Sequence, residues 1–223
     1  MREQTQNNTK PTGAGVRIII RFENQRIGES ALSQRWSGYT RSDRDLYHTP
    51  DWVTHTLLPA LRPVSCIWEP AAGQGKMTGA LEAAGYDVIA TDIADGLDFL
   101  AEKRHRGAEA IVTNPPFNQA REFIEHALAL MEPVRGQVAM LLRTDYDHAI
   151  TRQHLFGGCP AFAKKLVLTK RIVWYERPNA APSFNHAWYI WDWQHSGAPH
   201  LMYPCVDSRP PLAPATRALP RVS

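Results

Sequence analysis

Short apolar runs alternate with segments of helical periodicity along most of this chain, and this alternation constrains its fold more than any other feature. The expected strands are 64–68, 87–91, 108–113 and 137–142. The expected helices are 51–61, 76–84, 97–103, 120–131 and 148–156. Strands separated by helices need crossover connections, which produce a mostly parallel sheet covered on both faces. Two further β-rich runs, 165–175 and 186–193, follow each other without a helix and predict an antiparallel finish.

Composition divides the chain into three parts. Residues 1–42 predict a partly disordered N-terminal extension, 43–206 a single α/β domain, and 207–223 a disordered proline-rich tail. The formal net charge of +3 is carried by the two terminal segments, so it favours no class of partner.

Cysteines and apolar runs exclude other classes of protein. Cys66, Cys159 and Cys205 contain no CxxC pair, so neither a disulfide framework nor a metal site is expected. The sequence shows no signal peptide and no run long enough to span a membrane, which predicts a cytoplasmic protein with no membrane partner.

A glycine loop, Glu69-Pro70-Ala71-Ala72-Gly73-Gln74-Gly75, follows the first expected strand. Glycines at such a turn let the backbone approach a ligand closely. Three interpretations are open: a tight turn, a dinucleotide site of the GxGxxG type, and a site for S-adenosylmethionine (SAM). Thr78 stands at the third glycine position and Glu69 ends the strand. A carboxylate there suits the ammonium group of SAM better than a pyrophosphate.

Acidic residues also follow the next two elements. Asp92 ends the second expected strand, where a carboxylate can accept both ribose hydroxyls of a cofactor or can cap a helix. Asp98 could bind the adenine amino group of a cofactor while Phe99 flanks the ring. Alternatively, Phe99 belongs to the core and Asp98 to the solvent.

The most informative motif, Asn114-Pro115-Pro116-Phe117, ends the third expected strand. Neither proline can donate a hydrogen bond to a sheet, and both fix φ at about −65°. The motif therefore predicts a rigid corner with free carbonyls and a forward-pointing amide. Such a corner can hold an NH2 group by its hydrogens while a ring lies on the phenylalanine. A structural proline turn is the alternative.

Together with Tyr47-His48-Thr49-Pro50, these motifs resemble the class I SAM-dependent methyltransferases. Within that class the chain is most similar to the amino-methyltransferases, and among these to the small bacterial and phage DNA adenine-N6 enzymes. The cofactor motif precedes the catalytic motif, which is the γ arrangement of that family. The resemblance implies a Rossmann-like, mostly parallel seven-stranded sheet with an antiparallel C-terminal strand.

The resemblance implies SAM as the cofactor, with Tyr47, Thr49 and Pro50 helping to bind its methionine end. The expected cofactor-binding residues are Tyr47, Thr49, Pro50, Glu69, Pro70, Ala71, Gly73, Gly75, Asp92, Ile93, Asp98, Phe99 and Asn114.

The resemblance also implies that the corner is catalytic, through Asn114, Pro115, Pro116 and Phe117, and that the acceptor is adenine N6 in DNA. The N6 lone pair is delocalised into the ring and is a poor nucleophile. The Asn114 side-chain oxygen and the Pro115 carbonyl would hold the two N–H bonds and aim the lone pair at the sulfonium methyl. Phe117 would stack on the target ring, and no metal is required.

An adenine in duplex DNA must be flipped from the stack, which predicts a target pocket with a second aromatic wall. The resemblance places that wall in the connection from Arg177 to Phe184, and both residues are expected substrate contacts; Trp174 and Tyr175 are the alternatives to Phe184. The basic residues that could contact phosphates are Arg143, Arg152, Lys164, Lys165, Lys170, Arg171 and Arg177.

Two other hypotheses stay open. The same corner would serve another planar amino group, such as adenine or guanine in RNA, cytosine N4 or a protein glutamine. A protein that binds SAM without catalysis belongs to a different class.

Overall fold

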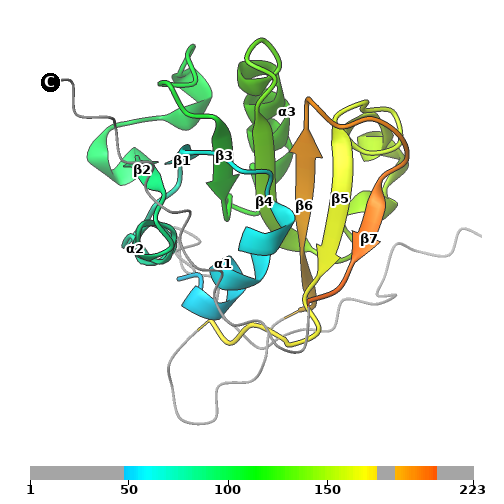
Figure 1. Ribbon diagram of the computed structural model, residues 1–223, viewed down its shortest axis with the longest axis horizontal. Helices are drawn as coiled ribbons and strands as arrows, with labels where there is room; N and C mark the ends of the chain where they lie inside the picture. Colours follow the sequence, from blue (N-terminus) through cyan, green and yellow to red (C-terminus); the bar gives the residue numbers. More distant parts are fainter. Residues whose placement is uncertain (1–47, 175–183, 205–223) are drawn as a thin grey trace, which may run out of the picture. The chain divides into compact units, whose positions relative to one another are not determined.

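The computed structural model describes residues 48–174 and 184–204. They all belong to the second of two units, Met1–Trp36 and Ser37–Ser223. The sheet of this unit has seven strands in the order β2-β1-β3-β4-β6-β5-β7 (Figure 1). Its strands are β1 (Cys66–Glu69), β2 (Asp87–Ala90), β3 (Ala110–Thr113), β4 (Gln137–Arg143), β5 (Phe162–Val167), β6 (His186–Asp192) and β7 (His200–Met202).

Strand directions confirm the predicted fold class. Strand β1 pairs in parallel with β2 and β3, and β3 pairs in parallel with β4. Strand β6 is antiparallel to both β4 and β5, whereas β7 is parallel to β5. The fold is therefore α/β, with a Rossmann-like, mostly parallel seven-stranded sheet and one reversed strand, β6. The short strand β7 was not predicted, and β5 begins three residues before the expected run 165–175.

The α-helices are α1 (Asp51–Leu57), α2 (Lys76–Ala83) and α3 (Ala120–Met131). The 3-10 turns are η1 (Leu58–Ala60), η2 (Ile93–Asp95), η3 (Phe99–Ala101), η4 (Tyr146–His148) and η5 (Ile150–Leu155). The expected helix 51–61 is shorter because Pro59 lacks the N–H that an α-helix needs, and the chain tightens into η1. The helices expected at 97–103 and 148–156 are 3-10 turns. None of the described helices is long and apolar enough to cross a membrane.

The core has two layers, one on each face of the sheet. Helices α1 and α2 pack through Val53, Leu57 and Leu81 against Ile67 and Trp188. Helix α3 packs on the other face, where Phe123 and Ile124 meet sheet residues such as Trp68, Ile111 and Trp191. Figure 1 shows α1 and α3 on opposite sides of the sheet. Neighbouring strand residues alternate between the layers, as the pleat of a strand requires.

The turn from β1 to α2 requires glycine at position 75. Gly75 has φ of 75°, in the left-handed region, and directly precedes α2. Gly73, two residues earlier, has φ of 53°. These two positions let the chain reverse tightly at the carboxyl end of β1.

We expect Gly75→Ala to lower the free energy of unfolding by about 1–2 kcal/mol, because a Cβ at positive φ crowds the following carbonyl. Crowding by other atoms is not the cause, since a Cβ at Gly75 would meet nothing within 4 Å. Gly79→Ala inside α2 also enters open space, and should raise the free energy of unfolding by up to about 1 kcal/mol. Urea unfolding followed by circular dichroism measures both; effects of the same sign would contradict the assignment.

Candidate active site

The parallel strands bring the predicted motifs to one edge of the sheet. Glu69 ends β1, Asp92 follows β2, and Asn114 follows β3. Because β2, β1 and β3 are adjacent and parallel, these three residues lie at the same carboxyl edge, where such sheets bind ligands. The structure therefore brings the glycine loop, Asp92 and the proline corner together at the carboxyl edge of the sheet.

Asp92 ties the glycine loop to the end of β2. Its Oδ2 accepts a hydrogen bond of 2.8 Å from the Gly73 N–H, and its Oδ1 accepts one of 2.9 Å from the Ala94 N–H. The Ala72 N–H also donates to the Thr91 carbonyl at 3.0 Å. The capping alternative for Asp92 is thus realised, and its ribose contact stays a prediction. Ile93 beside it is 71% exposed and offers an apolar surface at this edge.

Glu69 is a buried carboxyl group within the loop. It is only 2% exposed, and it accepts a hydrogen bond from the Thr78 hydroxyl. Burial raises the pKa of Glu69 to about 8, although the Thr78 hydrogen bond acts in the opposite direction, and nearby Asp92 raises it further. The carboxyl is therefore largely protonated at neutral pH, and a cation placed against it would favour its ionised form.

Phe99 is a correction to the predicted cofactor contacts. Its side chain is 2% exposed, and its ring lies 5.1 Å from the Trp68 ring and 4.9 Å from the Phe123 ring, between centroids. A ring enclosed in this way has almost no surface for a cofactor, so the structure supports the core alternative. Asp98 is exposed, and its Oδ1 accepts the Leu100 N–H at 3.0 Å.

The remaining predicted cofactor residues lie around the loop and before α1. Thr49 is 4% exposed, and Pro50 is the N-cap residue of α1, with an extended backbone. Pro70 is buried and Ala71 half-buried in the glycine loop. Tyr47 and Arg177, together with the alternative wall residue Tyr175, lie outside the described residues.

The proline corner leads directly from β3 into α3. Pro115 is buried, whereas Asn114, Pro116 and Phe117 are half-buried. The Pro116 carbonyl accepts the Gln119 N–H at 3.0 Å, one residue before α3 begins. The corner is therefore fixed on both sides by regular structure.

His186 supports the aromatic side of the corner, a role that sequence reasoning missed. Its ring centroid lies 6.3 Å from that of Phe117 with an interplanar angle of 31°. Trp174 meets His186 edge-on at 5.3 Å. Burial lowers the pKa of His186 to about 4, so the imidazole beside Phe117 carries no charge at neutral pH. Its position as the first residue of β6 gave no sequence signal for this contact.

The predicted second wall, Phe184, lies beside the end of β4. The Arg143 guanidinium is 4.4 Å from the Phe184 ring centroid, and Arg143 pairs with His186 across β4 and β6. Trp174, the alternative wall, is 9% exposed and belongs to the core layer of α1. Phe184 itself is half-buried and lies two residues before His186, and its role as a wall of a target pocket stays a prediction.

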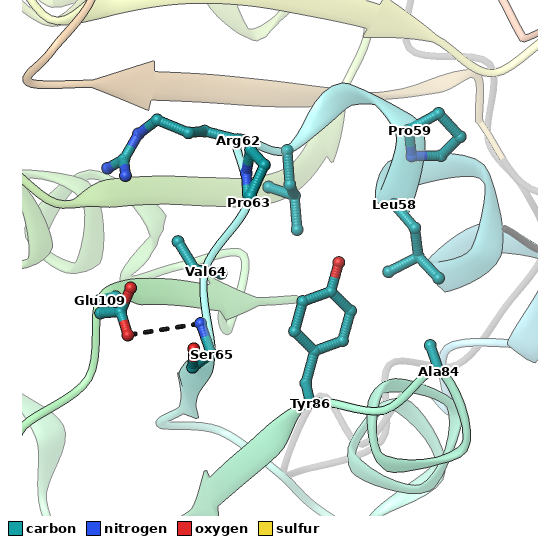
Figure 2. A pocket seen from close by; sticks show the side chains of 10 residues that line it. Leu58, Pro59, Arg62, Pro63, Val64, Ser65, Ala84, Tyr86 and Glu109 are labelled. Atoms are coloured by element: carbon teal, nitrogen blue, oxygen red, sulfur yellow. Dashed lines mark hydrogen bonds between the residues drawn. The ribbon is translucent and has the colours of Figure 1, made fainter. Parts of the chain in front are cut away.

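A pocket of about 420 Å³ opens at the opposite edge of the sheet. Its lining includes Ser65 before β1, Tyr86 before β2 and Glu109 before β3. Figure 2 shows the Tyr86 ring standing in this pocket, and Ser65 and Glu109 joined by a hydrogen bond of 3.3 Å. No predicted site residue lines it. Within 48–174 and 184–204, no three His, Cys, Asp or Glu side chains are placed to hold a metal ion.

Comparison with known proteins gives structural likenesses only. No family model and no curated protein match the chain. One similar structure is a Listeria monocytogenes protein assigned to the class I SAM-dependent methyltransferases (TM-score 0.46, 14% identity, 69% of this chain and 61% of that one). Another is a type I restriction-modification methyltransferase subunit from Streptococcus thermophilus (0.48, 13%, 67% and 45%). A third is 1,6-didemethyltoxoflavin-N1-methyltransferase from Burkholderia thailandensis (0.40, 13%, 64% and 75%).

The chain spans less than two thirds of the length of the first two of these proteins. At identities of 13–14% the likeness concerns the fold alone.

We expect Glu69→Gln to remove a pH dependence of stability. A carboxyl whose folded pKa is about 8 and whose ordinary value is 4.5 holds its proton longer in the folded state. Its contribution is therefore fully present below about pH 4.5 and is lost as the pH rises through about 8. Relative to the native chain, the variant should gain up to about 1.4 kcal/mol per pH unit within that window.

Urea unfolding at a series of pH values measures this difference. Glu82→Gln, at an exposed position of the same helix as Thr78, is the matched control. A stability difference between Glu69→Gln and the native chain that does not change with pH would contradict a buried, protonated Glu69.

Proposed function

We propose that the chain is a SAM-dependent methyltransferase that acts on the N6 amino group of adenine in DNA. One observation carries the proposal. The glycine loop with Asp92, and the Asn114 to Phe117 corner, lie on the adjacent strands β2, β1 and β3 at the same carboxyl edge. A cofactor bound by the first group would therefore end next to an acceptor held by the second.

The loop chemistry fits SAM better than a phosphate-bearing cofactor. Asp92 is acidic and buried, so its carboxylate would repel a pyrophosphate, and a pyrophosphate would offer the buried Glu69 carboxyl no compensating charge. The protonated Glu69 can ionise against an ammonium group, which supplies charge compensation that the free site lacks. Asp92 keeps lone pairs for ribose hydroxyls while it holds the loop, and exposed Ile93 offers a surface to an adenine ring.

SAM, when bound, supplies an electrophilic methyl group on sulfur. The Asn114 side-chain oxygen and the Pro115 carbonyl each accept a hydrogen bond from one N–H group of the target amine. These two hydrogen bonds turn the nitrogen lone pair toward that methyl group. Phe117 stacks on the target ring and is itself backed by His186. With SAM bound there, the amine nitrogen would take the methyl group, the electrons of the broken C–S bond would stay on sulfur, and the amine would release one proton to solvent. Positioning and electrostatics lower the barrier.

The deciding experiment incubates the protein with SAM and unmethylated plasmid DNA, followed by mass spectrometry of the nucleosides. We expect N6-methyladenine from the native chain. Asn114→Ala should lower the rate by on the order of 100-fold or more, because one positioned hydrogen-bonding group is lost. SAM binding by calorimetry should stay measurable, because the glycine loop and Asp92 remain. Asn118→Ala, one residue beyond the corner and exposed, is the matched control.

Other outcomes separate the alternatives. N4-methylcytosine would keep the mechanism and change the base. SAM binding without a DNA product would direct the test to RNA and to protein glutamine. An Asn114→Ala variant as active as the native chain would refute the role of the corner, and absence of SAM binding would refute the class.

A further inference from the structure

Arg143, at the end of β4, is held by two groups at once. Its Nε donates to Asp145 Oδ1 at 3.0 Å, and its Nη2 donates to Asp145 Oδ2 at 2.7 Å. The same guanidinium lies over the Phe184 ring. Both members of the ion pair are open to solvent, with side-chain exposures of 44% for Arg143 and 52% for Asp145. Burial is the largest single influence on the pKa of Asp145 and raises it, but the hydrogen bonds and positive charge of Arg143, together with smaller effects, hold that pKa below its usual value.

Arg143 also lies next to the catalytic corner. It is the direct strand partner of His186, and the His186 ring lies tilted beside the Phe117 ring. Asn185, the residue before His186, links Arg143 to a second arginine. Its carbonyl accepts the Thr144 N–H at 2.9 Å, and its Oδ1 accepts Arg171 Nε at 3.0 Å. Arg143 and Arg171 are therefore exposed guanidinium groups on either side of the segment that carries Phe184.

The other basic candidates differ from these two. Arg152 donates to the Tyr146 carbonyl at 2.7 Å, and Lys164 donates to the Ala60 carbonyl at 2.7 Å. Lys165 is bound by both carboxylate oxygens of Asp147 and is 16% exposed. These three side chains serve the fold, and the exposed Lys170 lies over the Trp52 ring at 5.2 Å.

We propose that Arg143 is a phosphodiester-binding group for the nucleic-acid substrate, and that Asp145 occupies it in the free protein as an internal competitor. The proposal rests on the proposed function and names a residue pair that controls entry to that site. The planar fork that binds the two Asp145 oxygens has the geometry that binds two phosphate oxygens. Phe184 keeps the guanidinium in place while one anion replaces the other, because a cation over a ring is attracted to it.

The exchange is inexpensive because the pair is exposed. Exposed ion pairs contribute little to stability and weaken further in salt, so a phosphate can displace Asp145 without unfolding the turn. The Asp145 carboxylate repels a phosphate that approaches Arg143. Binding of DNA should therefore be weaker with Asp145 present than without it, and this effect of Asp145 should require Arg143.

The test measures binding of a short fluorescent DNA duplex to the full chain, by anisotropy, over a series of KCl concentrations. Arg143→Gln should weaken binding on the order of 5-fold at low salt and reduce the slope of log K against log[KCl] by about 1, the loss of one phosphate contact. Asp145→Asn should tighten binding on the order of 3-fold, because the competitor is removed.

The double variant separates competition from a simple change of net charge. If Asp145 acts through Arg143, Asp145→Asn should give no tightening in the Arg143→Gln background. Arg106 and Glu102 are the matched control pair, because their ion pair of 2.7 Å also lies against an aromatic ring, that of Trp68 at 5.6 Å. They precede the amino end of β3, so Arg106→Gln and Glu102→Gln should leave the salt slope unchanged.

The proposal is overturned by an unchanged slope in Arg143→Gln, by no tightening in Asp145→Asn, or by tightening that persists in the double variant. It is also overturned if the native chain binds no DNA. Methyl transfer to DNA together with an unchanged salt slope in Arg143→Gln would refute the role of Arg143 and Asp145 and leave the proposed function standing. The expected salt slopes without methyl transfer would support that role and refute the proposed function.

Discussion

Strand β6 joins the two layers of the molecule, and the arrangement of the site depends on it. The Trp188 indole N–H donates to the Val53 carbonyl in α1 at 3.0 Å, and the Trp191 indole N–H donates to the Leu155 carbonyl in η5 at 2.6 Å. The two indoles point to opposite faces of the sheet, and every residue of β6 is buried. Each buried donor is satisfied by the layer that it enters, so β6 fixes both layers relative to the sheet.

The reversed direction of β6 explains why its first residue reaches the site. The parallel strands end at the carboxyl edge, whereas β6 begins there, so His186 meets Arg143 and Phe117. Further along β6, the Tyr189 hydroxyl lies 2.8 Å from the Thr144 carbonyl, and Lys165 binds both Asp147 and that same carbonyl. Side chains of β5 and β6 thus fix the turn after β4, and this restricts the motion of the side chains that the turn carries at the carboxyl edge.

The sequence could predict what local patterns determine. Helix α3 lies within the predicted bounds because its apolar stripe is continuous, and the proline corner falls where β3 ends. Contacts between distant residues had no such signal. Phe99 reads equally as a ligand contact or as core until Trp68 and Phe123 are known to surround it. The short strand β7 has exposed and half-exposed residues without alternation, and the Thr78 hydroxyl reaches Glu69 only once α2 folds back over β1.

Charge is distributed unevenly along the carboxyl edge, although the body of the chain is close to neutral. Glu69 and Asp92 lie on the β1 and β2 side, and Arg143 and Arg171 lie on the β4 and β5 side. The proline corner after β3 stands between them. In the proposed function, a cofactor ammonium group would draw the Glu69 carboxyl into its ionised form, and a phosphate would displace Asp145 from Arg143. A net charge sums the acidic and basic side chains of the body of the chain to nothing, which is why composition alone favoured no class of partner.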